Sequence, residues 1–216
     1  PCDWIELKEI SKKYDIQLIN DNCHALGASL LNDKNYAVKY ADIVIQSYHP
    51  VKHITTGEGG GLITNNQQIA EKVKKMRSHG MTKDHTELEK NNGPWYYEMH
   101  ELGYNYRITD FQCALGSNQL KRLDGFIRKR QQIAKKYDQY LSNINNLTLP
   151  GIQQNVEHAF HLYPLQIDFE KLPLNKSKFF EIMKELGVKL QVHYIPIHFQ
   201  PFYQKNYGFK TGDFPD

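Results

Sequence analysis

Four side chains that could carry out chemistry lie close together near the start of the sequence. Asp21 and His24 belong to the stretch DNCHALGA, and Ser47 and Lys52 belong to QSYHPVKHITTGEGGGLIT. Asp21 ends the apolar run QLIND, and Ser47 directly follows the apolar run DIVIQ. Because the carboxyl ends of parallel strands meet at one edge of an α/β sheet, we expect Asp21 and Ser47 to converge there, with Lys52 in the loop that follows.

These residue types match the requirements of pyridoxal 5'-phosphate chemistry. A lysine amine forms a Schiff base with the cofactor aldehyde, a carboxylate keeps the pyridine nitrogen protonated, and a hydroxyl binds the phosphate. The amine must lose its proton, and burial together with imine formation lowers the lysine pKa from its usual value near ~10.4. Once freed, the same amine can move a proton as a general acid and base. Asp21, Ser47 and Lys52 therefore predict this cofactor.

Each of these residues also has an ordinary structural interpretation. Lys52 could be a solvated loop lysine, Asp21 could simply begin a turn, and His24 could be a satisfied interior histidine. Ser47 has no diagnostic value alone. The glycines of GEGGG could only supply positive φ angles, and they do not form a nucleotide-binding P-loop because no Gly-Lys-Ser/Thr follows them. The prediction depends on the combination.

The first half of the chain alternates between strand and helix patterns. In chain order, it predicts a helix over 3–14, a strand ending at Asp21, a strand over 42–46, a strand at GLITN, and a helix over 66–78 that Gly80 ends. The strands are short and apolar, as expected for strands that are buried on both faces. We therefore predict an α/β fold built on a mostly parallel sheet.

The second half predicts a long helix and a smaller domain. Residues 81–97 are polar and read as an excursion loop, and Thr109 opens a helix that reaches Ile144, with bends at Gly116 and Gly125. Beyond Pro150, the pattern predicts a strand at HAFHLYPLQIDF, a helix at NKSKFFEIMKELG and a strand at VKLQVHYI. The expected division is a first domain over 1–149 and a smaller α+β domain over 150–216.

Composition excludes several classes of protein. The 216 residues are 40% apolar, enough for one sizeable domain or one domain with part of another. The net charge of +3 comes from scattered charges, which argues against a nucleic-acid partner. No apolar run approaches the roughly 18 residues of a membrane span. The three cysteines fit neither a disulfide framework nor zinc spacing, so we expect reduced thiols, no metal site and a cytoplasmic location.

Three motifs resemble one enzyme family: DNCHALGA, QSYHPVKHITTGEGGGLIT and GYNYRITDFQCALGSNQLKRLD. They are similar to the DegT/DnrJ/StrS sugar aminotransferases, which are fold-type-I, aspartate aminotransferase-like pyridoxal-phosphate enzymes. The resemblance runs in order from the first residues to TGDFP. The pattern SYHPVK-x-ITT-x-EGG is most similar to the branch that aminates UDP-linked 4-keto-6-deoxy-N-acetyl sugars for pseudaminic acid synthesis.

The resemblance implies a role for each candidate residue. Lys52 matches the Schiff-base lysine, Asp21 the carboxylate that pairs with the pyridinium, and His24 a residue beside the cofactor near its ring oxygen. Ser47 matches a phosphate ligand. Asn105 matches a residue that reaches the phosphate of the neighbouring subunit, which implies a homodimer with shared active sites.

Other positions are assigned less directly by the same resemblance. Tyr104 and Arg107 would lie close to the site, with Arg107 bracing the loop, and Glu58 would be structural. Two positions depart from the family pattern, because Asn22 stands where Ala or Ser is more usual and His53 stands where Pro is frequent. Neither has an obvious part in the chemistry.

The resemblance further implies the substrates and the domain content. Glutamate would load the cofactor with an amine, and a nucleotide-linked keto sugar would accept it. Residues 1–149 would be the C-terminal part of the large domain, including the long connecting helix, and 150–216 an incomplete small domain. The chain would then be a fragment, lacking an upstream phosphate loop with a ring-stacking aromatic and a C-terminal segment.

Two alternatives stay open at the level of sequence. A sugar dehydratase shares the fold but carries His in place of the lysine, so Lys52 argues against it. A truncated or non-catalytic relative would keep the fold without turnover of its own. Intact Asp21, Ser47 and Lys52 favour the aminotransferase.

Overall fold

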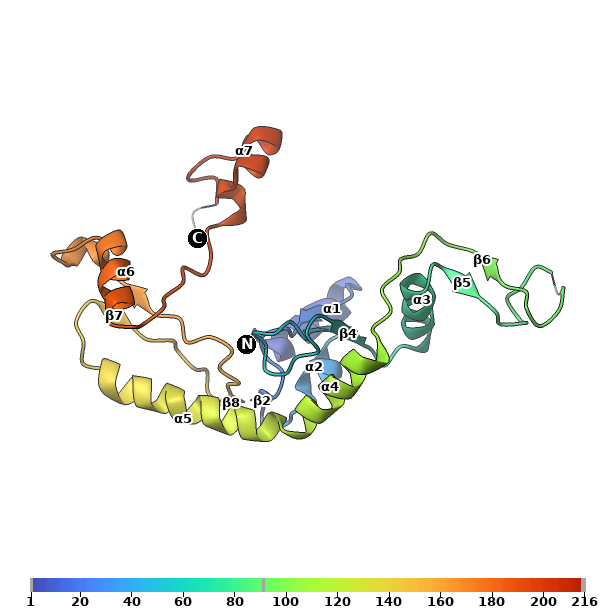
Figure 1. The fold of residues 1–216 in the computed structure, drawn as a ribbon, viewed down its shortest axis with the longest axis horizontal. Coiled ribbons are helices and arrows are strands. Elements are labelled where there is room, and N and C mark those ends of the chain that lie inside the picture. Colours follow the sequence, from blue (N-terminus) through green and yellow to red (C-terminus); the bar gives the residue numbers. More distant parts are fainter. Residues whose placement is uncertain (1, 91, 215–216) are drawn as a thin grey trace. The chain divides into compact units, whose positions relative to one another are not determined.

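A computed structural model describes residues 2–90 and 92–214 (Figure 1). The chain forms two compact units. The first extends to residue 139 and also includes 151–163, and the second includes 140–150 and continues from 164. The chain therefore passes between the units near residues 140, 150 and 163, and the predicted boundary at 149–150 lies beside one of these passages.

A three-stranded sheet in the first unit positions the candidate residues. Its strands are β1 (Ile19–Asp21), β3 (Ile43–Ser47) and β4 (Gly60–Ile63), with β3 in the centre. β1 pairs with β3 in parallel and β4 pairs with β3 in antiparallel orientation. The predicted α/β class is confirmed, and this sheet has one antiparallel pair because the loop over 48–59 turns the chain back along β3.

That loop is closed by backbone hydrogen bonds at its base. The Tyr48 N–H donates to the Gly59 carbonyl at 2.8 Å, and the Thr56 N–H donates to the Tyr48 carbonyl at 3.0 Å. The next residue, Gly60, packs against β3 so closely that an added Cβ would lie 2.8 Å from the Gln46 carbonyl oxygen. The glycine cluster thus lets the returning strand approach β3, which is a packing role rather than flexibility.

Helix α1 (Trp4–Tyr14) confirms the predicted N-terminal helix. Asp3 caps it, accepting hydrogen bonds from the Ile5 and Glu6 N–H groups at 3.2 and 3.1 Å. A short strand β2 (Ser29–Leu30) and a short helix α2 (Tyr36–Tyr40) were not predicted. These elements and the sheet enclose a hydrophobic core that includes Trp4, Ala28, Tyr36, Ala37, Ala41, Val44, Ile127 and Ala159.

Helix α3 (Gln67–Arg77) is also confirmed, with Asn66 as its N-cap. The predicted excursion loop contains more order than expected, because β5 (Met81–Thr82) pairs with β6 (Glu98–Met99) just beyond it. The rest of 83–97 consists of turns and irregular backbone, apart from residue 91, which lies outside the described residues.

The predicted long helix is instead two helices in sequence. Helix α4 (Asp110–Lys121) begins at Thr109, which forms a capping box with Gln112, and α5 (Leu123–Leu141) follows after Arg122. Figure 1 shows the chain changing direction where the two meet. The break falls between the two glycines at which bends were predicted.

Residues 151–163 return to the first unit and pack on it. Strand β8 (Val156–Glu157) pairs in antiparallel orientation with β2, and the Ser29 hydroxyl donates to the Glu157 carboxylate at 3.0 Å. The predicted strand over 158–169 is wrong for most of its length. Side chains of α5 donate hydrogen bonds to backbone carbonyls in 158–161, which a neighbouring strand would otherwise have to satisfy. Only β9 (Gln166–Ile167) is extended and paired.

The second unit contains β9 paired with β7 (Leu147–Thr148), short 3-10 helices over Phe169–Lys171 and Ile197–Phe199, helix α6 (Lys176–Glu185) and helix α7 (Pro201–Tyr207). Helix α6 confirms the predicted helix, and Gly187 follows it with a φ of 80°. The strand predicted over 188–195 is wrong, because this stretch has no strand partner among the described residues. No helix in the described part of the chain is long and apolar enough to span a membrane.

We expect Gly60→Ala to destabilise the protein by about 1–3 kcal/mol, the usual range for overpacking. The added methyl group would meet a backbone carbonyl of β3, which cannot move without disturbing the pairing of β3 with β4. Urea unfolding would measure the change. Gly151→Ala is the matched control, because a Cβ at Gly151 meets nothing within 4 Å. Equal unfolding free energies for the two variants would contradict this account of the glycine cluster.

Candidate functional site

Asp21 and Ser47 reach the same edge of the sheet. In the parallel pairing of β1 with β3, Asp21 lies opposite Ile45, and Ser47 ends β3 two residues later. The Asn22 N–H donates to the Ile45 carbonyl at 2.9 Å, which extends the ladder beyond the end of β1. The predicted convergence of the two strand ends is therefore what the sheet builds.

The turn after β1 keeps the carboxylate of Asp21 ionised. The Cys23 N–H donates to Asp21 Oδ1 at 3.1 Å. Hydrogen bonds from the thiol and the backbone of Cys23 lower the pKa of Asp21, and electrostatic interactions with His24 and Lys52 lower it further. A carboxylate with a lowered pKa keeps its negative charge at neutral pH and can pair with a cation.

The thiol beside this carboxylate is not a nucleophile. Burial and the neighbouring Asp21 raise the pKa of Cys23 to about 11. The protonated thiol points to the Ile45 carbonyl, with Sγ 3.8 Å from the oxygen. Since the thiolate is the reactive form of cysteine, the pKa of Cys23 assigns it a structural role.

Lys52 lies half-buried in the closed loop after β3. Its N–H donates to the His49 carbonyl at 2.9 Å, while the His49 N–H approaches the Ser47 hydroxyl at 3.4 Å. The positive charge of Lys52 lowers the pKa of Asp21 and of Cys23. The loop thus brings the lysine into the electrostatic range of the carboxylate on the neighbouring strand.

Three histidines from three segments meet beside these residues. The ring centroid of His161 lies 4.3 Å from that of His24 and 5.5 Å from that of His53. His24 follows Asp21 in the first turn, His53 follows Lys52 in the loop, and His161 comes from the returning segment 151–163. The sequence motifs indicate a role for His24 but none for His53 or His161.

Burial keeps two of these imidazoles neutral. It is the main cause that lowers the pKa of His53 to about 4 and that of His161 to about 3, and the charges of Lys52 and Arg130 add to it. The backbone of Ala159 acts in the opposite direction and raises the pKa of His53, although neither ring nitrogen of His53 forms a well-aligned hydrogen bond with the described residues. At neutral pH, His53 and His161 therefore add no positive charge around Lys52.

Side chains of α5 hold the segment that carries His161. Arg130 Nη1 donates to the carbonyls of Phe160 and His161 at 3.0 and 3.3 Å, and Gln131 donates to the His158 carbonyl at 3.2 Å. Ala159 is only 1% exposed within the core. The stretch HAFHLYP is rich in His and aromatic residues, which could have indicated a site segment. The same residues also fit a β-strand pattern, so the sequence did not distinguish the two.

Asn22, which departs from the family pattern, is a structural residue. It is buried, and its side-chain oxygen accepts a hydrogen bond from the Tyr36 hydroxyl at 3.0 Å. This bond ties the turn after β1 to helix α2. Burial raises the pKa of Tyr36, so the phenol remains a donor.

The other predicted residues lie elsewhere in the first unit. Asn105 is exposed and bridges to Ser78 beside the end of α3, and no interaction of the described residues links it to Asp21, Ser47 or Lys52. The Tyr104 N–H donates to the Met76 carbonyl at 2.7 Å. The Glu58 carbonyl accepts hydrogen bonds from the Thr56 hydroxyl and the Gln112 amide.

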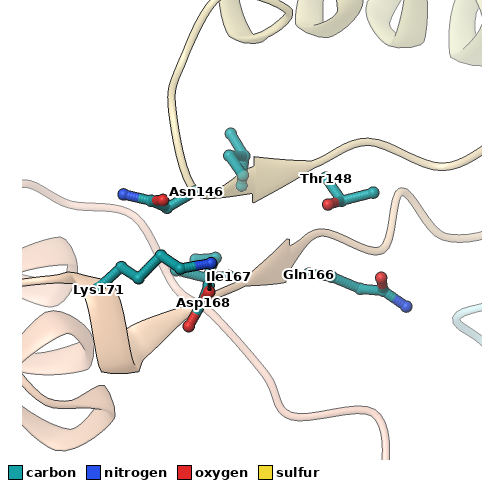
Figure 2. A pocket seen from close by; sticks show the side chains of 7 residues that line it. Asn146, Thr148, Gln166, Ile167, Asp168 and Lys171 are labelled. Atoms are coloured by element: carbon teal, nitrogen blue, oxygen red, sulfur yellow. Dashed lines mark ion pairs between the residues drawn. The ribbon is translucent and has the colours of Figure 1, made fainter.

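Neither of two solvent-accessible pockets includes the predicted residues. One, of about 540 Å3, lies in the first unit between α1, Asp42 and the start of α3. The other, of about 480 Å3, lies in the second unit between β7 and β9 (Figure 2). Figure 2 shows its polar lining, in which Lys171 and Asp168 form an ion pair at 2.7 Å. No group of three or more His, Cys, Asp or Glu side chains is placed to bind a metal in 2–90 and 92–214.

The residues at the sheet edge fit pyridoxal 5'-phosphate. An ionised carboxylate, a hydroxyl and a lysine amine come from adjacent strand ends, and the carboxylate lies within electrostatic range of the amine. These are the groups that the cofactor requires: an acceptor for the protonated pyridine nitrogen, a donor for the phosphate and an amine for the aldehyde. The chemistry of the donor set thus agrees with the cofactor predicted from sequence.

Known proteins resemble this chain along most or all of its length. An uncharacterised protein of Methanocaldococcus jannaschii is 42% identical over 216 residues, which are all of this chain and 55% of that protein. A UDP-4-amino-4,6-dideoxy-N-acetyl-beta-L-altrosamine transaminase of Campylobacter jejuni is 40% identical over 203 residues, which are 94% of this chain and 51% of that protein. The chain spans about half the length of the curated relatives it matches.

The fold is shared with solved aminotransferases. The structure of Helicobacter pylori PseC, described as an aminotransferase involved in pseudoaminic acid biosynthesis, matches with a TM-score of 0.81 at 30% identity, covering 96% of this chain and 53% of that one. The sequence model of the DegT/DnrJ/EryC1/StrS aminotransferase family matches residues 1–216, and enzymes of this family depend on pyridoxal phosphate. The chain belongs to the DegT/DnrJ/EryC1/StrS aminotransferase family.

Proposed function

We propose that the chain forms the catalytic part of a pyridoxal-phosphate-dependent sugar aminotransferase. The amino donor is glutamate, and the acceptor is the carbonyl of a nucleotide-linked 4-keto-6-deoxy sugar. One observation carries the proposal: Asp21, Ser47 and Lys52 converge at one sheet edge, and the charge of Lys52 acts on Asp21. The transaminase of Campylobacter jejuni and PseC support the class of sugar and a place in pseudaminic acid synthesis.

Three residues would hold the cofactor, and His24 would lie beside its ring. Lys52 would bind its aldehyde through Nζ, the Asp21 carboxylate would face its ring nitrogen, and the Ser47 hydroxyl would contact its phosphate. The bound cofactor supplies an aldehyde and a ring that withdraws electrons from the reacting carbon. Asp21 is suited to this place because its pKa is lowered, so that it keeps a full negative charge beside a protonated ring.

Lys52 would also move the proton. When its amine is not engaged with the cofactor, Nζ can take a proton from the substrate carbon and return it one position away. The loop that carries Lys52 is closed by the Tyr48 and Gly59 hydrogen bond, which limits the positions that Nζ can reach. The rings of His53 and His161 stay neutral because burial lowers their pKa values, so they add no positive charge near it.

The proposal includes a homodimer with shared sites. Asn105 would serve the phosphate site of the partner, which agrees with its exposure and with its backbone bridge to Ser78 instead of to a candidate residue. Large apolar side chains near it are also exposed, with Leu102 at 85%, Tyr106 at 71% and Phe111 at 91%. Several large, exposed apolar side chains within ten residues of one another are typical of a surface that another chain covers.

The proposal assigns each domain and places the protein in the cell. Residues 1–149 would belong to the large cofactor-binding domain and 150–216 to the small domain, with 151–163 packed on the first unit. Free cysteines at positions 2, 23 and 113 support a reducing, cytoplasmic location.

Lys52→Ala should abolish amination while leaving the fold intact. Loss of a positioned acid and base alone removes about 10²–10⁴-fold in rate, and loss of the covalent anchor adds to this. The measurements are turnover with a UDP-linked keto sugar and borohydride reduction with pyridoxal phosphate, followed by peptide mapping. Lys74→Ala is the matched control, because Lys74 is an exposed lysine of α3.

Two results would contradict this assignment. Turnover by Lys52→Ala comparable to that of Lys74→Ala would remove Lys52 from the chemistry. A pyridoxyl label that maps to another lysine in the wild-type protein would place the anchor elsewhere.

Asp21→Asn should retain measurable cofactor binding but slow turnover by about 10²–10³-fold, as when one preorganised electrostatic partner is removed. The amide keeps the shape of the side chain but cannot hold a proton on the ring nitrogen by charge. Asp15→Asn is the control, because Asp15 has a left-handed backbone conformation that Asn also adopts readily. Unchanged kinetics in Asp21→Asn would show that another group faces the ring nitrogen.

A further inference from the structure

One imidazole ring contacts the neighbours of both chemistry-bearing residues. His161 packs against His24, three residues after Asp21, and lies near His53, directly after Lys52. The turn after β1 and the loop after β3 are separate segments, joined at their bases by the sheet. Beyond the sheet edge, the ring of His161 lies against residues of both the turn and the loop.

The three rings differ in exposure, and this difference indicates which ring supports which. His53 is 3% exposed, His161 is partly buried and His24 is exposed. His161 is also held from behind, because its carbonyl and that of Phe160 accept hydrogen bonds from Arg130. A fixed ring therefore supports the ring of His24 on its more exposed turn.

We propose that His161 is a positioning residue, whose ring places His24 and the Asp21 turn correctly against the loop that carries Lys52. This inference rests on the proposed function, since the turn and the loop are the parts that would grip the cofactor. His161 itself does not touch the reacting atoms. Its contribution is the shape of a neutral ring that bridges two segments.

The electrostatics of His161 agree with such a role. Its Nδ1 is buried and has no hydrogen-bond partner in the part of the chain that the structure describes. His24 of the turn, Lys52 and His53 of the loop, and Arg130 of α5 interact with it electrostatically. Burial and nearby charged groups such as Lys52 and Arg130 lower the pKa of His161 to about 3. The ring is therefore neutral at neutral pH and does not repel His24.

This role makes a specific prediction about which substitutions are tolerated. Since Nδ1 forms no hydrogen bond and the ring carries no charge, His161→Phe keeps the feature that the proposal requires, which is an aromatic ring in contact with His24. His161→Ala removes it. We expect the dissociation constant for pyridoxal phosphate to rise by roughly tenfold in His161→Ala, within the range for residues in contact, and by less than about threefold in His161→Phe.

A double-mutant cycle distinguishes positioning from general support of the fold. The four proteins are the wild type, His24→Ala, His161→Ala and the double variant. If His161 acts through His24, the tenfold effect of His161→Ala should fall below about twofold once His24 is absent. His158→Ala is the matched control in the same segment, because the ring of His158 contacts Phe160 instead, and its effect should be equal with and without His24.

Three results would overturn the inference. An additive cycle in cofactor affinity would show that His161 does not act through His24. Coupling found in urea unfolding of the cofactor-free proteins but absent from cofactor affinity would make the contact purely structural. A loss in His161→Phe as large as in His161→Ala would mean that the nitrogen atoms, and not the ring shape, are needed.

Borohydride labelling of the wild type separates this inference from the proposed function. A pyridoxyl label on Lys52 with an additive cycle overturns the role of His161 alone. A well-folded wild-type protein that takes no label on Lys52 overturns the proposed function and this inference with it. A labelled Lys52, a coupled cycle and tolerance of His161→Phe together support both.

Discussion

The parallel pairing of β1 with β3 is the constraint on which the candidate site depends. Its register places Asp21 opposite Ile45, so that both strands end at one edge and their polar residues meet there. Side chains alternate between the faces of a strand, and a shift of one residue would turn Asp21 to the opposite face. The electrostatic effect of Lys52 on Asp21 follows from this register, because the two residues come from different strands of the pair.

The loop after β3 turns this edge into a shaped site. Hydrogen bonds close the loop at Tyr48 and Gly59, and the glycines that follow let β4 lie against β3. Lys52 is thereby held on a short, closed segment instead of a mobile one. The buried ring of His53 anchors the next residue, so the backbone on that side of Lys52 has little freedom.

The returning segment 151–163 links the site to the rest of the chain. It leaves the second unit, pairs with β2, contributes Ala159 to the core and brings His161 against His24. Because Arg130 and Gln131 of α5 bind its carbonyls at residues 158, 160 and 161, this part of the segment needs no strand partner. The same helix also contributes Ile127 to the core. Helix α5 therefore supports both the hydrophobic core and the segment that carries His161.

The sequence alone was sufficient for the α/β class, for helices α1, α3 and α6, and for the position of Asp21 and Ser47 at the ends of neighbouring strands. These depend on local periodicity, caps and strand ends, which are properties of neighbouring residues. Tertiary structure decided what sequence could not: the antiparallel β4, the break at Arg122, the loss of two predicted strands, and the meeting of His24, His53 and His161. Each of these depends on contacts between distant segments. The burial that makes two imidazoles neutral exists only once those segments have packed together.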